Sequence, residues 1–110
     1  MQLASARRWS ELAPGVPLTE EAIRARHQPG GHYRIAASTY PAGTDFAGVS
    51  QPATFYIVSG RCKFTCEGVE VSLIQGDVLI WPGGDFSVSV TGGDNLQFVR
   101  AWLLPLEFRK

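Results

Sequence analysis

The stretch GDVLIWPGGDFSVSV, residues 76–90, predicts two short β-strands joined by a tight turn. DVLIW and FSVSV are rich in β-branched and aromatic residues, and the Pro-Gly-Gly segment between them is typical of a turn. Similar short strands continue on both sides of it, each bounded by Gly, Pro, Asp or Asn: HYRIAASTY, TFYIVSG, RCKFTCEG, VEVSLI and LQFVRAWLL. Strands of this number and spacing predict an all-β fold of the sandwich, barrel or jelly-roll type.

The same stretch resembles the second conserved motif of the cupins, a family of small jelly-roll β-barrels. That motif reads G-x5-P-x-G-x2-H-x3-N, and Gly76, Pro82 and Gly84 match its first half, whereas Ser87 stands at the histidine position and Thr91 at the asparagine position. FYIVSGRCKF similarly resembles the aromatic strand and closing glycine of the first motif. The resemblance implies a cupin-type jelly-roll (double-stranded β-helix) barrel.

The first cupin motif, G-x5-H-x-H-x3/4-E-x6-G, lacks its metal ligands in this chain. If Gly60 is the closing glycine, the glutamate position falls on Ala53, and the histidine positions fall on Ala47 and Val49 or, with the longer spacing, on Phe46 and Gly48. Residues 46–91 contain no histidine. A divalent metal in a protein needs about three or four imidazole or carboxylate ligands at about 2.0–2.3 Å. The sequence therefore predicts a cupin without a metal and without a cofactor.

The first thirty-one residues differ from the rest and are expected to form an arm of the same domain, followed by the barrel over residues 32–110. TEEAIRARH predicts one short helix from about Thr19, as N-cap, to His27, with two acidic residues in the first turn. ELAPGVPL, which precedes it, is rich in turn-forming residues and predicts irregular chain over the body of the domain.

Composition narrows the classes of function. A chain of 110 residues, 45% of them hydrophobic, suits one compact domain. Ten basic and ten acidic residues give no net charge, which argues against nucleic acid as a partner. No apolar run approaches the roughly 20 residues of a membrane span, and the N-terminus lacks a secretory pattern, so we expect no membrane association and a cytoplasmic location.

The two cysteines, Cys62 and Cys66, lie four residues apart in one predicted strand. At about 3.3 Å per residue their Cα atoms would be about 13 Å apart, beyond the roughly 7 Å limit for a disulfide. We expect two small apolar side chains that point inward beside Phe64.

Strand alternation offers two orientations for residues 86–91. If Ser87 points inward, as the histidine of the family does, Ser89 and Thr91 share its face and form a polar lining for a ligand. In the alternative, which the pattern favours, Phe86, Val88 and Val90 pack in the core and the hydroxyls meet water.

Other candidate ligand-binding residues are Arg100, Phe55 and Arg34. LQFVRAWLL is apolar on both faces, so Arg100 should meet a carboxylate, a ligand anion or solvent, and snorkelling at an edge is the alternative. In the register set by Gly60, Phe55 points inward as a stacking wall for a ring, and Tyr56 points away.

His32 and Tyr40 are the candidate catalytic residues, and Arg34 shares their face of the first long strand. They are residue types suited to general base and acid work, and metal-free cupins that act as epimerases, isomerases or dehydratases use such a pair. A solvated histidine at a strand start is the alternative.

Three functions stay open at this point. The first is a domain that binds a small polar or sugar-like molecule; the second is a metal-free lyase, isomerase or epimerase that uses His32 or Tyr40; the third is a structural or dimerising domain plugged by its own bulky side chains. By resemblance to other small cupins we expect a homodimer.

Overall fold

The computed structural model describes residues 5–27, 32–66 and 68–104. Their order is β1 (Ser5–Arg8), α1 (Trp9–Leu12), α2 (Glu20–His27), β2 (Tyr33–Tyr40), β3 (Asp45–Ser50), β4 (Ala53–Ser59), β5 (Arg61–Cys66), β6 (Val69–Ile74), β7 (Asp77–Trp81), β8 (Gly84–Thr91) and β9 (Leu96–Leu103). Neither of these two helices has the length and apolar character needed to cross a bilayer.

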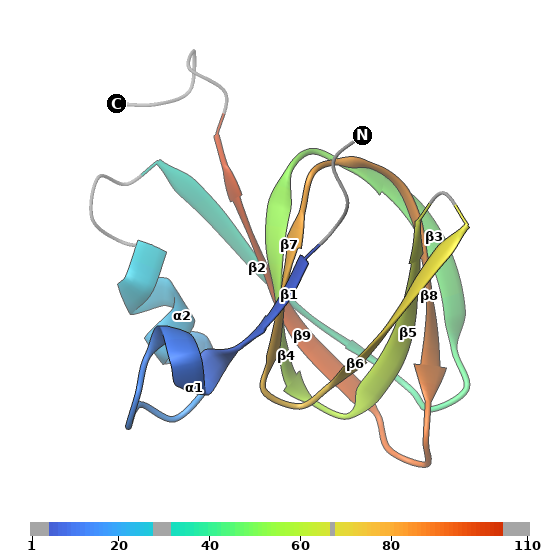
Figure 1. Cartoon of the computed structure of the whole chain (residues 1–110), viewed down its shortest axis with the longest axis horizontal. Helices are drawn as coiled ribbons and strands as arrows, with labels where there is room; N and C mark the ends of the chain where they lie inside the picture. The colour runs from blue at the N-terminus through green and yellow to red at the C-terminus, as the bar shows by residue number, and fades with distance from the viewer. Residues whose placement is uncertain (1–4, 28–31, 67, 105–110) are drawn as a thin grey trace.

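The strands form two antiparallel sheets that face each other. The five-stranded sheet has the order β1-β7-β4-β9-β2, and the four-stranded sheet has the order β3-β8-β5-β6. Figure 1 shows the two sheets side by side, with both helices on the side of the five-stranded sheet that faces away from the other sheet. The predicted all-β jelly roll is therefore confirmed.

The main core lies between the sheets and follows the alternation of each strand. Ala53, Phe55 and Ile57 of β4 are buried in it, while Tyr56 points to the other side, as predicted. Cys62 is buried in the same core and Cys66 packs against it, and the two are not joined by a disulfide. Strands that bury one row of apolar side chains in this way fix their own register, because a slip of one residue would expose the whole row.

A second core lies on the outer face of the five-stranded sheet, under the helices. Ile23 of α2 is fully buried there, and Trp9 of α1 packs edge-on against Tyr56 at 5.8 Å between ring centroids. The backbone N–H of Ala22 donates to Thr19 Oγ1 at 3.1 Å, which confirms Thr19 as the N-terminal cap of α2. Strand β9 is buried on both faces because it lies between the two cores.

The N-terminal arm contains more regular structure than the sequence predicted. Its first described residues form β1, which pairs with β7, and then α1, so the expectation of a single helix was wrong. The backbone N–H of Arg8 donates to Glu11 Oε1 at 3.0 Å at the start of α1. SARR has no apolar alternation, and it becomes a strand because the edge of β7 supplies backbone partners.

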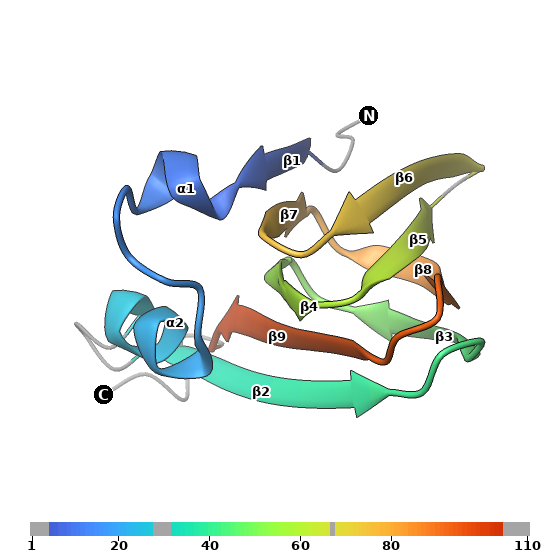
Figure 2. The same cartoon turned by 90° about the horizontal axis from the view of Figure 1, so that it is seen from below.

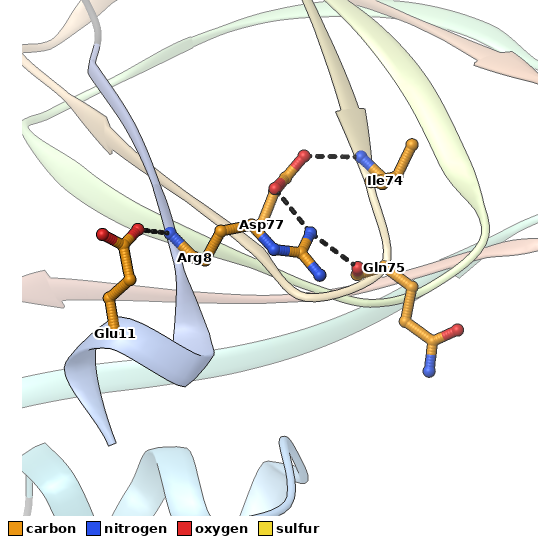
Figure 3. A network of polar contacts seen from close by, with 5 residues as sticks. All are labelled: Arg8, Glu11, Ile74, Gln75 and Asp77. Carbon is orange, nitrogen blue, oxygen red and sulfur yellow. Dashed lines mark hydrogen bonds and ion pairs between the residues drawn. The ribbon is translucent and has the colours of Figure 1, made fainter. Parts of the chain in front are cut away.

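A polar clamp fastens this arm to the β6–β7 turn (Figure 3). Arg8 Nη1 donates to Asp77 Oδ1 at 2.8 Å and to the carbonyl of Gln75 at 3.0 Å, while Asp77 Oδ2 accepts from the N–H of Ile74 at 2.8 Å. Gly76 lies beneath the guanidinium with φ +93°, and a Cβ there would be 2.7 Å from Arg8 Nη2. The conserved-motif glycine thus leaves room for the clamp as well as for the turn.

Candidate functional site

Aromatic side chains line the region in which a cupin would hold its metal. With the longer spacing of the first motif, the histidine positions fall on Phe46 and Gly48, which lie opposite Val88 and Phe86 in the β3–β8 pair. A Cβ on Gly48 would meet the Phe86 ring at 3.3 Å, so the missing side chain makes room for that ring. Phe46 and Gly48 therefore supply no donor side chain at the two histidine positions of the first motif, and Phe86, which precedes Ser87 at the histidine position of the second, supplies none either.

The rings around this point form one connected cluster. Phe64 lies 5.3 Å from Phe86, 5.4 Å from Phe55 and 5.1 Å from Trp81 between ring centroids. Trp81 is almost completely buried, and its indole N–H has no hydrogen-bond partner among the described residues. In the described ranges, no three His, Cys, Asp or Glu side chains come together in a way that could hold a metal ion.

Deeper in the interior the packing is complete. A residual cavity of about 10 Å³ lies between Phe55, Phe64, Val88 and Leu96, and every residue around it is apolar or a thiol. A void of this size holds about one water at most, and an apolar one stays dry. This part of the interior has no space for a ligand.

Open space of useful size remains at the seam between the two sheets, and we call it the seam groove. Its volume is about 230 Å³. The residues that line it come from β2, β3, β4, β8 and β9: Ala36, Ser38, Tyr40, Phe46, Ala47, Gly48, Val49, Phe55, Phe86, Phe98 and Arg100. In Figure 2, β2 runs from beside α2 to the side of β3, which brings its C-terminal end to this seam.

Arg100 is the cation of the seam groove. It is half-buried on the inner face of β9, opposite Ala36 of β2 and Phe55 of β4. Its guanidinium carbon lies 4.4 Å from the centroid of the Trp102 ring, so the planar group is supported by a cation–π contact. Within the described ranges no carboxylate forms an ion pair with Arg100. Arg100 thus lies at the edge of an open space between the sheets.

Three rings beside Arg100 lie nearly parallel. Tyr40 stacks on Phe46 with 4.1 Å between centroids and 17° between planes, and it lies 5.8 Å from Phe98 at 11°. Phe46 and Phe98 are 6.4 Å apart at 7°. Because all three planes agree within 17°, they give the groove a preferred direction for a flat molecule.

The inward orientation of Ser87 and Ser89 was wrong. Val88 and Val90 are each 5% exposed in the main core, and Phe86 packs against it, so the serines between them point away from the interior. Ser87 is exposed on the outer face of the four-stranded sheet. A molecule bound between the sheets would not meet either hydroxyl, and the alternative orientation of this strand is the one found.

The structure also separates the predicted catalytic residues. Tyr40 ends β2 in the seam groove, whereas His32 precedes the other end of the same strand, eight positions away. At about 3.3 Å per residue their Cα atoms are roughly 26 Å apart, so they do not converge on one substrate. Arg34 is exposed and lies outside the groove, whereas Phe55 does line it, as expected.

A polar pair that the sequence analysis did not single out lies under α2, outside the groove. His27 Nε2 and the Tyr56 hydroxyl are 2.7 Å apart, and His27 also packs against Tyr33 at 4.6 Å between centroids. Burial lowers the pKa of His27, and the Arg26 guanidinium lowers it further. Burial raises the pKa of Tyr56 against the opposing effect of Arg26. This pair joins α2 to β4. The two residues are 29 positions apart in the sequence, so no local pattern indicates that they meet.

Comparison of this fold with known structures gives a consistent result. An uncharacterized conserved protein with a double-stranded β-helix domain from Klebsiella pneumoniae superposes with a TM-score of 0.57 at 20% identity, over 64% of this chain and 65% of that one. A cupin superfamily protein from Desulfitobacterium hafniense superposes with a TM-score of 0.57 at 9% identity, over 94% of this chain and 79% of that one. The protein has the cupin fold.

A third similar structure shows how little the fold says about chemistry. A predicted oxalate decarboxylase from Thermotoga maritima matches this protein at 26% identity with a TM-score of 0.56, over 80% of this chain and 76% of that one. No protein-family model and no curated protein matches the sequence. The chain spans just under two thirds of the Klebsiella relative, so activities of whole relatives do not transfer to it directly.

Proposed function

We propose that this cupin domain works without a metal and binds a small polar molecule in the seam groove. The observation that supports it is Arg100, a half-buried cation beside an open space and without a carboxylate partner in the described ranges. Leaving such a group half-desolvated costs free energy that an anion or a hydrogen-bond acceptor from a ligand would recover. The aromatic wall beside it supplies apolar contact area.

The size of the groove limits the ligand. Typical ligand pockets measure about 300–1,000 Å³, and a 150 Å³ apolar cavity holds one benzene. On this scale the 230 Å³ groove holds a molecule of about ten non-hydrogen atoms. Nucleotides and oligosaccharides are too large to be enclosed there.

Two other functions are weaker against this geometry. A lyase, isomerase or epimerase that needs both His32 and Tyr40 is disfavoured by their separation along β2, because Tyr40 in the groove would have no histidine as its acid–base partner. A purely structural domain would account for the filled deep interior, but it does not explain why a half-buried arginine faces an open groove.

A thermal-shift screen tests the proposal with small carboxylates, sugars, nucleotides and divalent metals. A ligand at a hundredfold excess over its dissociation constant adds about 2.7 kcal/mol of stability, or roughly 10 °C in Tm for a domain of this size. We expect hits among small polar molecules that Phe46→Ala weakens. A screen with no hits, or hits that are indifferent to the groove, would favour the structural role.

We also propose a homodimer. Tyr33, Ile80 and Leu103 are 41%, 46% and 42% exposed on the outer face of the five-stranded sheet. They line a shallow depression of about 210 Å³ beyond the part of this face that the helices cover. Apolar groups gathered in this way are typical of a contact between proteins. Light scattering should give twice the chain mass for the wild type and the single mass for Ile80→Lys; a monomeric wild type would contradict this.

A further inference from the structure

The ligand class of the seam groove follows from three of its properties, and the inference rests on the proposed binding function. We infer that the groove is built for a small carboxylate with a flat, apolar body, such as a ring bearing one carboxyl group. The three properties are the charge of the lining, the orientation of its rings and the number of its polar side chains.

The charge of the lining selects an anion. Arg100 is the charged residue among those that line the groove, and no Asp or Glu is present among them. A guanidinium has five N–H donors in a planar fork that matches the two oxygens of a carboxylate. The Trp102 ring lies against the guanidinium at 4.4 Å and supports it from one side. A cation held in this way is prepared for a bidentate contact, because little side-chain entropy remains to be lost.

The rings select a flat body. Tyr40, Phe46 and Phe98 lie within 17° of a common plane direction. Phe98 and Arg100 are two residues apart on the same face of β9, so their Cα atoms are about 7 Å apart. A single ring with one carboxyl group spans that interval, with its ring beside the aromatic wall and its carboxylate at the guanidinium. The ring of the ligand and the rings of the wall would then meet in the offset-stacked or edge-to-face contacts that aromatic pairs prefer.

The scarcity of polar side chains disfavours a sugar. Beyond Arg100, the polar side-chain groups of the lining are the hydroxyls of Ser38 and Tyr40. A hexose would bring about five hydroxyl groups into this space, and each one left without a partner carries an uncompensated desolvation cost. A carboxylate needs partners at one end only, and Arg100 supplies them. Arg100, Ser38 and Tyr40 are therefore too few to satisfy the hydroxyl groups of a sugar, but they are sufficient for an acid with an apolar body.

An NMR titration with four probe compounds tests this inference. Benzoate is the probe that we expect to bind. Benzamide has its shape without the charge, cyclohexanecarboxylate has the charge without the flat ring, and glucose is the polar alternative. A ligand of this size binds with a dissociation constant on the order of a millimolar. Benzoate should shift the amide signals of β2, β3 and β9, and we expect benzamide to bind at least tenfold more weakly. Cyclohexanecarboxylate should fall between them, and glucose should cause no shifts.

Variants locate the effect. Arg100→Gln should weaken benzoate at least tenfold and leave benzamide unchanged, and Arg100→Lys, which keeps the charge but loses the fork, should give an intermediate loss. Arg61→Gln is the matched control, because it removes one exposed arginine of β5 away from the groove, and it should bind benzoate as the wild type does. Dispersed amide spectra and an unchanged Tm show that each variant is folded.

The outcomes separate this inference from the proposed function. If glucose or benzamide binds in the groove as well as benzoate does, the inferred ligand class is wrong and the binding function stands. If benzoate binds equally to the wild type and to Arg100→Gln, the inference fails because the carboxylate is not held by the guanidinium. If no probe and no compound of the thermal-shift screen binds, both are wrong.

Discussion

Removal of one ring from the aromatic cluster should cost a large part of the stability of the domain. Phe64 is 2% exposed and contacts three other rings between 5.1 and 5.4 Å. Phe64→Ala loses about 1.5–3 kcal/mol of apolar burial and part of three ring contacts worth about 0.5–1.5 kcal/mol each. Core Phe→Ala changes cost 3–5 kcal/mol in total, so we expect about 4 kcal/mol. At about 4 °C per kcal/mol, Tm should fall by roughly 15 °C.

Urea unfolding followed by tryptophan fluorescence measures this change, with calorimetry for Tm. Val49→Thr is the control, because Val49 is 76% exposed on β3 and threonine keeps its β-branched shape. It should change the free energy of unfolding by no more than about 0.5 kcal/mol. A folded Phe64→Ala protein that loses less than about 1 kcal/mol would refute the tight packing of the rings on which the proposal of a metal-free interior depends.

Three further predictions concern groups outside the groove. Asp77→Asn removes the partly exposed ion pair to Arg8, so it should lower the free energy of unfolding by at most about 1 kcal/mol. It should also speed amide hydrogen exchange in β1. Unchanged exchange would show that the clamp does not hold the arm. His27 has a lowered pKa in the folded state, so as pH falls below 6.5 the unfolded chain takes up the proton first and the free energy of unfolding drops. His27→Gln should flatten this dependence of stability on pH between pH 7 and 5. An unchanged dependence would assign it to other groups. Burial raises the pKa of Cys62 to about 11, so iodoacetamide at pH 8 should label it only after unfolding, and rapid labelling of the native thiol would contradict its burial.

The positions of most strands could be predicted because their sequences alternate strongly and glycines punctuate them. Gly60, for example, joins β4 to β5 with φ +83°, and a Cβ there would lie 2.4 Å from the carbonyl oxygen of Asn95. Only glycine fits that turn, and the resemblance to the cupin motif depends on it. Once Gly60 set the register of β4, the inward positions of its side chains followed from alternation alone.

The elements that escaped prediction lack such local signals. Strand β3 contains Gly48, and its exposed Val49 gives it no continuous apolar face. It forms because β8 supplies hydrogen-bond partners along its whole length. The arm strand β1 depends in the same way on β7. Tertiary pairing of this kind cannot be derived from a short polar segment by itself.

Some residues of the candidate groove could be singled out from the sequence. Arg100 stood out because a cation in an apolar strand needs a partner or solvent, and Phe55 followed from the register of β4. The orientation of Ser87 depended on a one-residue choice that a motif frame without its histidine could not fix. The parallel stack of Tyr40, Phe46 and Phe98 combines side chains from three strands, and their relative positions arise only when the two sheets close on each other.

The most direct test of the central claim, that phenyl rings have taken the place of metal ligands in this cupin fold, is elemental analysis by mass spectrometry. The protein would be purified without an affinity tag, incubated separately with iron, manganese, nickel and zinc salts, and freed of unbound ions. Because Phe46, Gly48 and Phe86 offer no donor atoms, we predict far less than one ion per chain for each metal. One tightly held ion per chain, lost in a variant that alters the interior, would contradict the claim.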